Sequence, residues 1–163
     1  MSRIVPCIWC DYTAEEAAEF YVSLLPDSRI VSIQRTPVDT PSQKAGDVIT
    51  AEIELAGQPF LLLNGGPQFP HSEAVSFQIH TDSQEETDRL WNAIVDHGGA
   101  ESACGWCKDK WGLSWQITPR RLIALISDPD TGRAARAMQA MMTMTRIDIA
   151  AIEAAADAAP ANA

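Results

Sequence analysis

A repeated helix-start pattern constrains the fold of this chain more than any other feature. Thr13 is followed three residues later by Glu16, and Ser83 by Glu86, so the capping-box signature of a helix N-terminus occurs twice, 70 positions apart. Each signature follows a strand-like apolar stretch and precedes further strand-like stretches. The sequence therefore predicts a duplicated α+β fold built from two strand–helix–strands modules.

The first module is expected over residues 3–66. A strand at 4–10 leads into a helix whose apolar residues recur at helical spacing, and Pro26 ends that helix because proline cannot continue it. Alternating or continuous apolar runs then predict three strands, at 28–35, 47–55 and 58–63.

The second module is expected over residues 74–119 and is the shorter of the two. It has a strand at 74–82, a helix that ends at Gly98-Gly99, and strand candidates at 100–107 and 112–118. C-terminal helices are predicted within 120–157, followed by a disordered tail at 158–163. We expect the modules and these helices to form one domain, 1–157.

Charge and hydropathy exclude several classes of partner. The chain has 22 acidic and 12 basic residues and a net charge of -10, which repels phosphate backbones and argues against nucleic-acid binding. No apolar run is long enough to span a bilayer, and the first residues lack the apolar segment of a secretory signal. We therefore expect a cytoplasmic protein, whose thiols are reduced.

Four cysteines raise the alternative of a zinc or redox protein. They form two pairs with the same spacing, Cys7 with Cys10 and Cys104 with Cys107. Residues three apart on a regular strand point to opposite faces, so the first pair could bind one zinc ion only around a bulge or turn. We favour cysteines that serve as small buried apolar residues.

Polar and apolar residues alternate along two predicted strands. Their apolar rows should pack on helices. The polar rows then either meet water or, if the modules curl toward each other, line a cleft suited to a small molecule. The polar rows are Ser76, Gln78 and His80 in one strand and Ser114, Gln116 and Thr118 in the other; the apolar rows are Val75, Phe77 and Ile79, and Leu113, Trp115 and Ile117.

Several motifs resemble one known family. LNGGP at 63–67, QEETDRLW at 84–91, and CGW with DKWGLSWQI inside 104–117 are similar to the PhnB-like branch of the glyoxalase/bleomycin-resistance/dioxygenase superfamily, which has the vicinal oxygen chelate fold. The resemblance covers nearly all of 3–152. It implies two βαβββ modules that form one curved mixed sheet, and a homodimer to which the methionine-rich C-terminal helices could contribute. The branch often carries the name 3-demethylubiquinone-9 3-methyltransferase, but no strand here ends in the Gly-rich loop that binds S-adenosylmethionine.

The superfamily's metal positions can be carried onto this sequence. The resemblance places them at Val5 or Pro6, at Phe60 or Leu62, at Ser76, and at Gln116. Divalent metals prefer imidazole, carboxylate or thiolate ligands, which none of these side chains offers. We therefore expect no metal and no cofactor.

The resulting hypothesis is a cleft that binds a small, partly aromatic molecule and either converts or only sequesters it. The sequence assigns no catalytic residue. The less favoured alternative is the zinc or redox protein described above. The candidate binding residues are Trp9, Asn64, Ser76, Gln78, His80, Trp115 and Gln116.

Overall fold

The structure is a computed structural model that describes residues 3–41 and 43–159. The chain divides into two compact units, one ending at Pro70 and the other beginning at His71. Each unit is built around its own four-stranded sheet.

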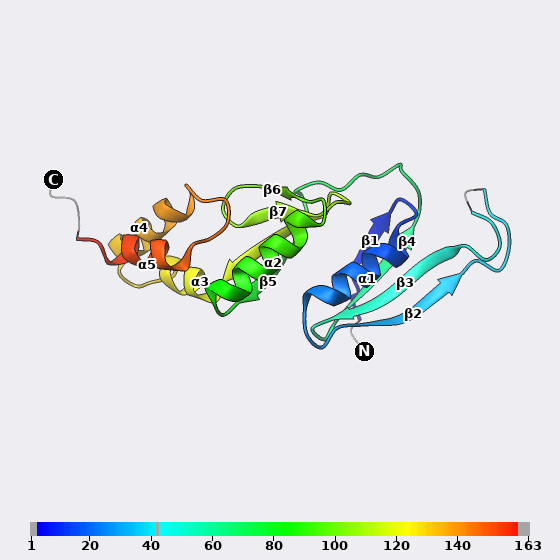
Figure 1. Cartoon of the computed structure of the whole chain (residues 1–163), viewed down its shortest axis with the longest axis horizontal. Coiled ribbons are helices and arrows are strands. Elements are labelled where there is room, and N and C mark those ends of the chain that lie inside the picture. Colours follow the sequence, from blue (N-terminus) through cyan, green and yellow to red (C-terminus); the bar gives the residue numbers. More distant parts are fainter. Residues whose placement is uncertain (1–2, 42, 160–163) are drawn as a thin grey trace. The chain divides into compact units, whose positions relative to one another are not determined.

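The first unit is a mixed sheet with one helix. Its strands are β1 (Cys7–Cys10), β2 (Arg29–Arg35), β3 (Val48–Leu55) and β4 (Gln58–Asn64), and they lie in the order β1-β4-β3-β2 (Figure 1). β1 runs parallel to β4, whereas the other pairs are antiparallel. Helix α1 (Ala14–Leu24) joins β1 to β2.

Helix α1 covers one face of this sheet. Ala51 pairs with Leu62 and Ile53 with Phe60 across β3 and β4, so these buried side chains share a face. The helix adds Ala14, Ala17, Ala18, Tyr21 and Leu24 to the same core. Alternate strand residues, including Trp9, Leu61 and Leu63, project from the opposite face.

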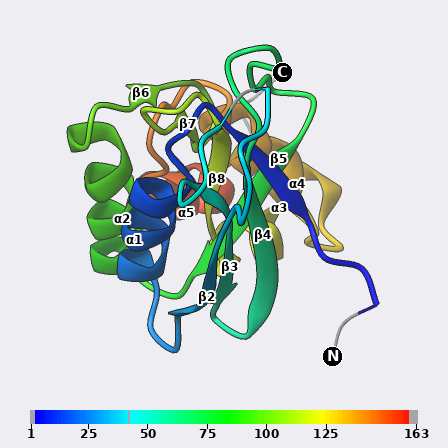
Figure 2. The same cartoon turned by 90° about the vertical axis from the view of Figure 1, so that its right-hand side faces the viewer.

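The second unit repeats this topology. Its strands are β5 (Ser76–Thr81), β6 (Ala100–Glu101), β7 (Trp106–Lys108) and β8 (Ser114–Pro119), in the order β5-β8-β7-β6, and helix α2 (Gln84–Asp96) follows β5 (Figure 2). β5 is parallel to β8, as β1 is to β4. The predicted α+β fold of two βαβββ modules is therefore confirmed, as two four-stranded sheets.

Two local predictions need correction. The segment 100–107 is two short strands instead of one, because positive φ angles at Cys104 (60°) and Gly105 (81°) turn the chain between them. The two capping boxes also differ. Ser83 accepts a hydrogen bond from the Glu86 backbone amide at 3.1 Å, whereas the Thr13 side chain makes no cap hydrogen bond.

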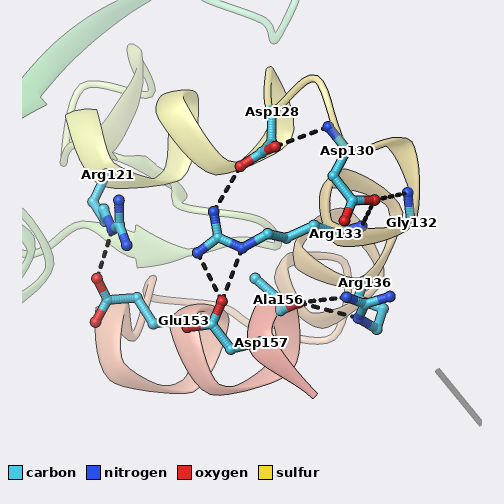
Figure 3. Close-up of polar contacts among 9 residues, drawn as sticks. All are labelled: Arg121, Asp128, Asp130, Gly132, Arg133, Arg136, Glu153, Ala156 and Asp157. Carbon is cyan, nitrogen blue, oxygen red and sulfur yellow. Dashed lines mark hydrogen bonds and ion pairs between the residues drawn. The ribbon is translucent and has the colours of Figure 1, made fainter. Parts of the chain in front are cut away.

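Three helices follow β8 in the second unit, as predicted: α3 (Arg120–Ile126), α4 (Thr131–Met141) and α5 (Ile149–Asp157). They enclose a core of their own, made of Leu122, Leu125, Ala137, Ile147, Ile152 and Ala156. Arg133 bridges Asp128 at 2.6 Å and Asp157 at 2.7 Å and so ties α4 to α5 (Figure 3). No helix within the described residues is long and apolar enough to cross a membrane.

Backbone contacts attach this helical segment to the second module. Gln84 donates to the Ile147 carbonyl at 3.0 Å and accepts from the Ile149 amide at 2.8 Å. The Cys104 amide donates to the Met144 carbonyl at 2.8 Å. The segment is thus fixed to both α2 and the turn before β7. Of the tail predicted at 158–163, residues 160–163 lie outside the described residues.

Candidate functional site

The polar face of the second sheet brings several predicted site residues together. β5 and β8 lie side by side in parallel, with Gln78 opposite Gln116 and Ser76 opposite Ser114. Aligned residues of neighbouring strands point to the same face. The opposite face, which includes Ile79, Trp115 and Ile117, is buried beside α2.

A hydrogen-bonded chain runs across this face. The Gln116 amide donates to the Ser76 hydroxyl at 2.8 Å, and Gln78 donates to the Gln116 carbonyl oxygen at 3.2 Å. Gln116 is half-buried between its partners, which fixes the orientation of its amide. Three side chains from two strands thus form one neutral array of donors and acceptors that could orient a polar ligand group.

His80 extends the same polar row to the end of β5. It lies opposite Thr118 in the register and is exposed, whereas Thr118 is buried. An imidazole in this position is available to solvent at the rim of the face, two residues beyond Gln78.

Trp115 lies on the other side of the sheet. It is 2% exposed, its indole nitrogen donates to Asp109 at 2.9 Å, and its ring lies 5.8 Å from that of Phe77. Asp109 also accepts the backbone amides of Trp111 and Leu113 at 3.0 Å each. The structure thus places Trp115 in the core, where it and Asp109 hold the turn before β8.

Trp9 lies in the first unit, on the face away from α1. Its indole nitrogen donates to the Gly66 carbonyl at 2.6 Å, and its ring meets Phe69 edge-on at 4.9 Å. Leu63 is its register partner on β4. The half-buried indole thus lies on the face of the first sheet that α1 does not cover.

Asn64 supports the backbone of the first unit. Its side-chain oxygen accepts the Ala14 amide at 2.9 Å, and its amide donates to the Val48 carbonyl at 2.9 Å. The side chain is 7% exposed and borders a pocket of about 470 Å³. Both ends of the amide are therefore engaged in joining α1 and β3 to the end of β4.

The first unit also has a larger groove. It measures about 780 Å³ and lies along β3 and β4 and the start of β2. Its lining mixes exposed apolar residues such as Val5 and Val31 with the ion pair between Arg29 and Glu54. None of the seven candidate binding residues borders it, although Val5 and Phe60, two positions carried over from the family's metal site, do.

The metal positions implied by the family do not fit a metal ion. Phe60 and Leu62 are apolar and lie on the buried face of the sheet that α1 covers, so neither side chain offers a metal ligand. Ser76 and Gln116 do meet, but as neutral hydrogen-bond partners. Within the described part of the chain, no three His, Cys, Asp or Glu side chains gather as a metal site would require.

The cysteine pairs are no better suited to a shared ion. Cys7 aligns with Leu61 and is exposed, whereas Cys10 aligns with Asn64 and is buried, so the two thiols point to opposite faces of the sheet. Cys107 is buried on the face that contains Trp115. Burial and the nearby charge of Asp109 raise the pKa of the Cys107 thiol to about 12, which disfavours the thiolate that metals and redox chemistry need.

Two residues of the polar face, both on β7, were absent from the predicted site. Trp106 lies opposite Gln116, and Lys108 lies opposite Ser114. The apolar pattern predicts one strand over 100–107, which does not reveal the register of β7. Gly105 is the sequence signal for a turn inside this segment, and with a turn there, strand alternation puts Trp106 and Lys108 on one face.

This architecture defines a class of protein. Two βαβββ units, each with its first strand parallel to its last, form the glyoxalase/bleomycin-resistance fold. Two solved structures share it: FosX, a fosfomycin resistance protein from Listeria monocytogenes (9% identity, TM-score 0.50, covering 73% of this chain and 93% of that one), and a glyoxylase/bleomycin resistance protein/dioxygenase domain from Frankia (16%, 0.50, 73% and 92%). At these identities the likeness concerns the fold alone.

Comparison with protein families identifies a narrower group within this fold. The 3-demethylubiquinone-9 3-methyltransferase family matches residues 2–118, and the chain belongs to this PhnB-like family of the superfamily. A PhnB protein from Bacillus cereus is 32% identical, with a TM-score of 0.66, and the match covers 72% of this chain and 99% of that one. No curated protein matches the chain.

Proposed function

We propose that this protein binds a small, partly aromatic molecule against the polar face of the second sheet, without a metal ion. The observation that carries the proposal is the hydrogen-bonded chain of Ser76, Gln116 and Gln78. A few oriented polar groups are what small-molecule sites use to fix a ligand. Ser76 and Gln116 are also two of the four positions that the resemblance carries over from the superfamily's metal site, which supports the placement.

Conversion of the ligand is the second half of the proposal. No residue pair on the polar face has the geometry of a nucleophile and its base, so any reaction would use the Gln116 amide to polarise a ligand carbonyl and His80 to exchange a proton at the rim. Sequestration without reaction remains the alternative. Prolonged incubation followed by mass spectrometry of the released ligand distinguishes the two outcomes.

Binding can be tested by replacing Gln116. The Gln116→Leu variant keeps the volume of the side chain and removes its amide, so it should bind polar aromatic fragments at least about tenfold more weakly than the wild type does. Gln139, exposed on α4, supplies the control variant Gln139→Leu. Equal affinities for wild type and Gln116→Leu in ligand-observed NMR would refute this site. Stoichiometric zinc in elemental analysis would favour the cysteine-based alternative.

The assembly state belongs to the same proposal. We expect residues 1–157 to act as one domain and the chain to form a homodimer. Met138 and Met142, exposed on and just after α4, would contribute to the dimer contact. Light scattering of wild type and of a Met138→Glu/Met142→Glu variant tests this expectation, and an unchanged mass would remove α4 from the contact.

A further inference from the structure

A buried hydroxyl on the polar face has no partner. Ser114 is 1% exposed, and among the described residues nothing hydrogen-bonds its Oγ. A buried polar group left unpaired costs about 1–3 kcal/mol. This cost needs a reason, because most buried hydroxyls in native proteins are satisfied. A ligand atom bound on this face would supply the missing partner.

A cation lies directly across from that hydroxyl. Lys108 on β7 is the register partner of Ser114 on β8, so the two side chains leave the sheet on the same face. Within the strands β5 to β8, all of them described, Lys108 is the one lysine or arginine. The chain as a whole carries a net charge of -10. Lys108 is therefore the one permanent positive charge that these four strands contribute to the polar face.

Lys108 already holds an anion that is easily displaced. Its ammonium group pairs with Glu73 at 2.5 Å, and the Glu73 side chain is 64% exposed in the segment before β5. The hydrogen bond from Lys108 holds the pKa of Glu73 below its usual value, so the carboxylate is charged at neutral pH. An exposed ion pair of this kind is weak. A ligand carboxylate could therefore take the position of Glu73.

An aromatic surface adjoins these groups. Trp106 is the register partner of Gln116 and lies two residues before Lys108 on β7, so its half-buried indole shares the face. Aromatic pairs in stacked or edge-to-face contact contribute about 0.5–1.5 kcal/mol beyond the burial of their area. The polar face thus combines an aromatic ring, a cation and an unpaired hydroxyl with the hydrogen-bonded chain of Gln78, Gln116 and Ser76.

We propose that the ligand of this site is an aromatic carboxylate. Its carboxylate accepts hydrogen bonds from Lys108 and Ser114, displacing Glu73, and its ring packs on Trp106. The inference rests on the proposed function, since it names the chemical class that the same face takes. It adds Trp106 and Lys108 to the site and gives a ligand-binding role to Ser114 of the polar row.

Matched acids and amides test the proposal. Benzoate with benzamide, and indole-3-carboxylate with indole-3-carboxamide, differ in charge but little in shape, and ligand-observed NMR titration gives their dissociation constants. Wild type should bind each acid at least about tenfold more tightly than its amide, the factor expected for a charge-assisted hydrogen bond. Lys108→Met should abolish this preference, and Lys108→Arg should keep it. Glu73→Gln should tighten acid binding, because the internal competitor for Lys108 is gone.

The control is Lys110→Met, which changes the net charge equally. Lys110 lies over the ring of Trp111, outside the polar face, so its variant should keep the wild-type preference for acids. Circular dichroism of each variant checks its fold. Equal binding of acids and amides, or a preference that survives Lys108→Met, overturns the proposal. If acids and amides bind equally and Gln116→Leu weakens the binding of both, the proposed function stands while the carboxylate inference fails. If no probe binds in a manner that depends on Gln116, both proposals fail.

Discussion

The indole ring of Trp9 lies so close to the backbone of Gly65 that a β-carbon at position 65 would be 2.1 Å from its Cζ2 atom. The neighbouring Gly66 accepts the indole hydrogen bond at 2.6 Å. This contact gives a physical reason for the LNGGP motif, because only glycine at position 65 allows the ring to approach. The conformation of the chain after β4 therefore depends on a side chain from β1.

Gly65→Ala should destabilise the protein by about 1–3 kcal/mol, the usual cost of forcing extra volume into a packed site. In a Trp9→Ala background the ring is gone, so the same substitution should cost much less. Urea denaturation of the four proteins of this double-mutant cycle measures the difference as a coupling energy. An equal cost of Gly65→Ala in both backgrounds would show that the ring does not set the limit.

The two helix starts give a matched pair of predictions. Ser83→Ala removes the hydroxyl that accepts the Glu86 amide, and should destabilise the protein by about 1 kcal/mol. Thr13→Ala removes a side chain without a cap hydrogen bond, and should cost clearly less. Thermal or urea unfolding of both variants provides the comparison. Similar losses would mean that Thr13 caps α1 in solution after all.

This pair also shows what the sequence could reveal about the fold. The repeat of Thr13-x-x-Glu16 and Ser83-x-x-Glu86 located both helices, because the spacing of side chains around a helix start is a local property. It could not decide which hydroxyl forms the bond. That depends on backbone angles, which are extended at Ser83 (φ −144°, ψ 164°) but near φ −115° and ψ 14° at Thr13.

The candidate site was predicted only in part, because the sequence again shows local spacing and not the partners of each side chain. Alternation along β5 and β8 was enough to put Ser76, Gln78 and Gln116 on one face. The same alternation puts Trp115 in the apolar row that packs on a helix, so its place in the core follows from the sequence. For Asn64 the side-chain partners matter, and these lie elsewhere in the chain, at Ala14 and Val48. Strand periodicity carries no information about such distant partners, so it cannot separate a ligand-binding polar residue from one that holds the backbone.

Cys107 should make stability depend on pH in the alkaline range. Its pKa is about 12 in the folded protein, against about 8.5 in an unfolded chain. Below pH 8.5 the thiol is protonated in both states, whereas above it the unfolded state alone loses the proton. Stability should therefore fall between about pH 9 and 12, by up to about 1.4 kcal/mol per pH unit.

Urea denaturation at pH 7, 9 and 10 measures this effect, with Cys107→Ala as the comparison. The variant lacks the thiol, so the stability difference between wild type and variant should shrink or reverse as the pH rises. A constant difference across the three pH values would show that Cys107 ionises alike in both states.

Arg133 should hold α5 against α4 more firmly than a surface ion pair could. Its side chain is 27% exposed and contacts Asp128 and Asp157 together, whereas Arg120 reaches Asp82 with both partners well exposed. Because the bridge joins the two helices, Arg133→Ala should raise hydrogen-exchange rates of the α5 amides by roughly two- to fivefold. Arg120→Ala should leave them unchanged. Since Gln84 independently binds the Ile147 carbonyl and the Ile149 amide, exchange at the first turn of α5 should rise least. A uniform rise along α5 would instead mean that Arg133 controls the docking of the whole helix.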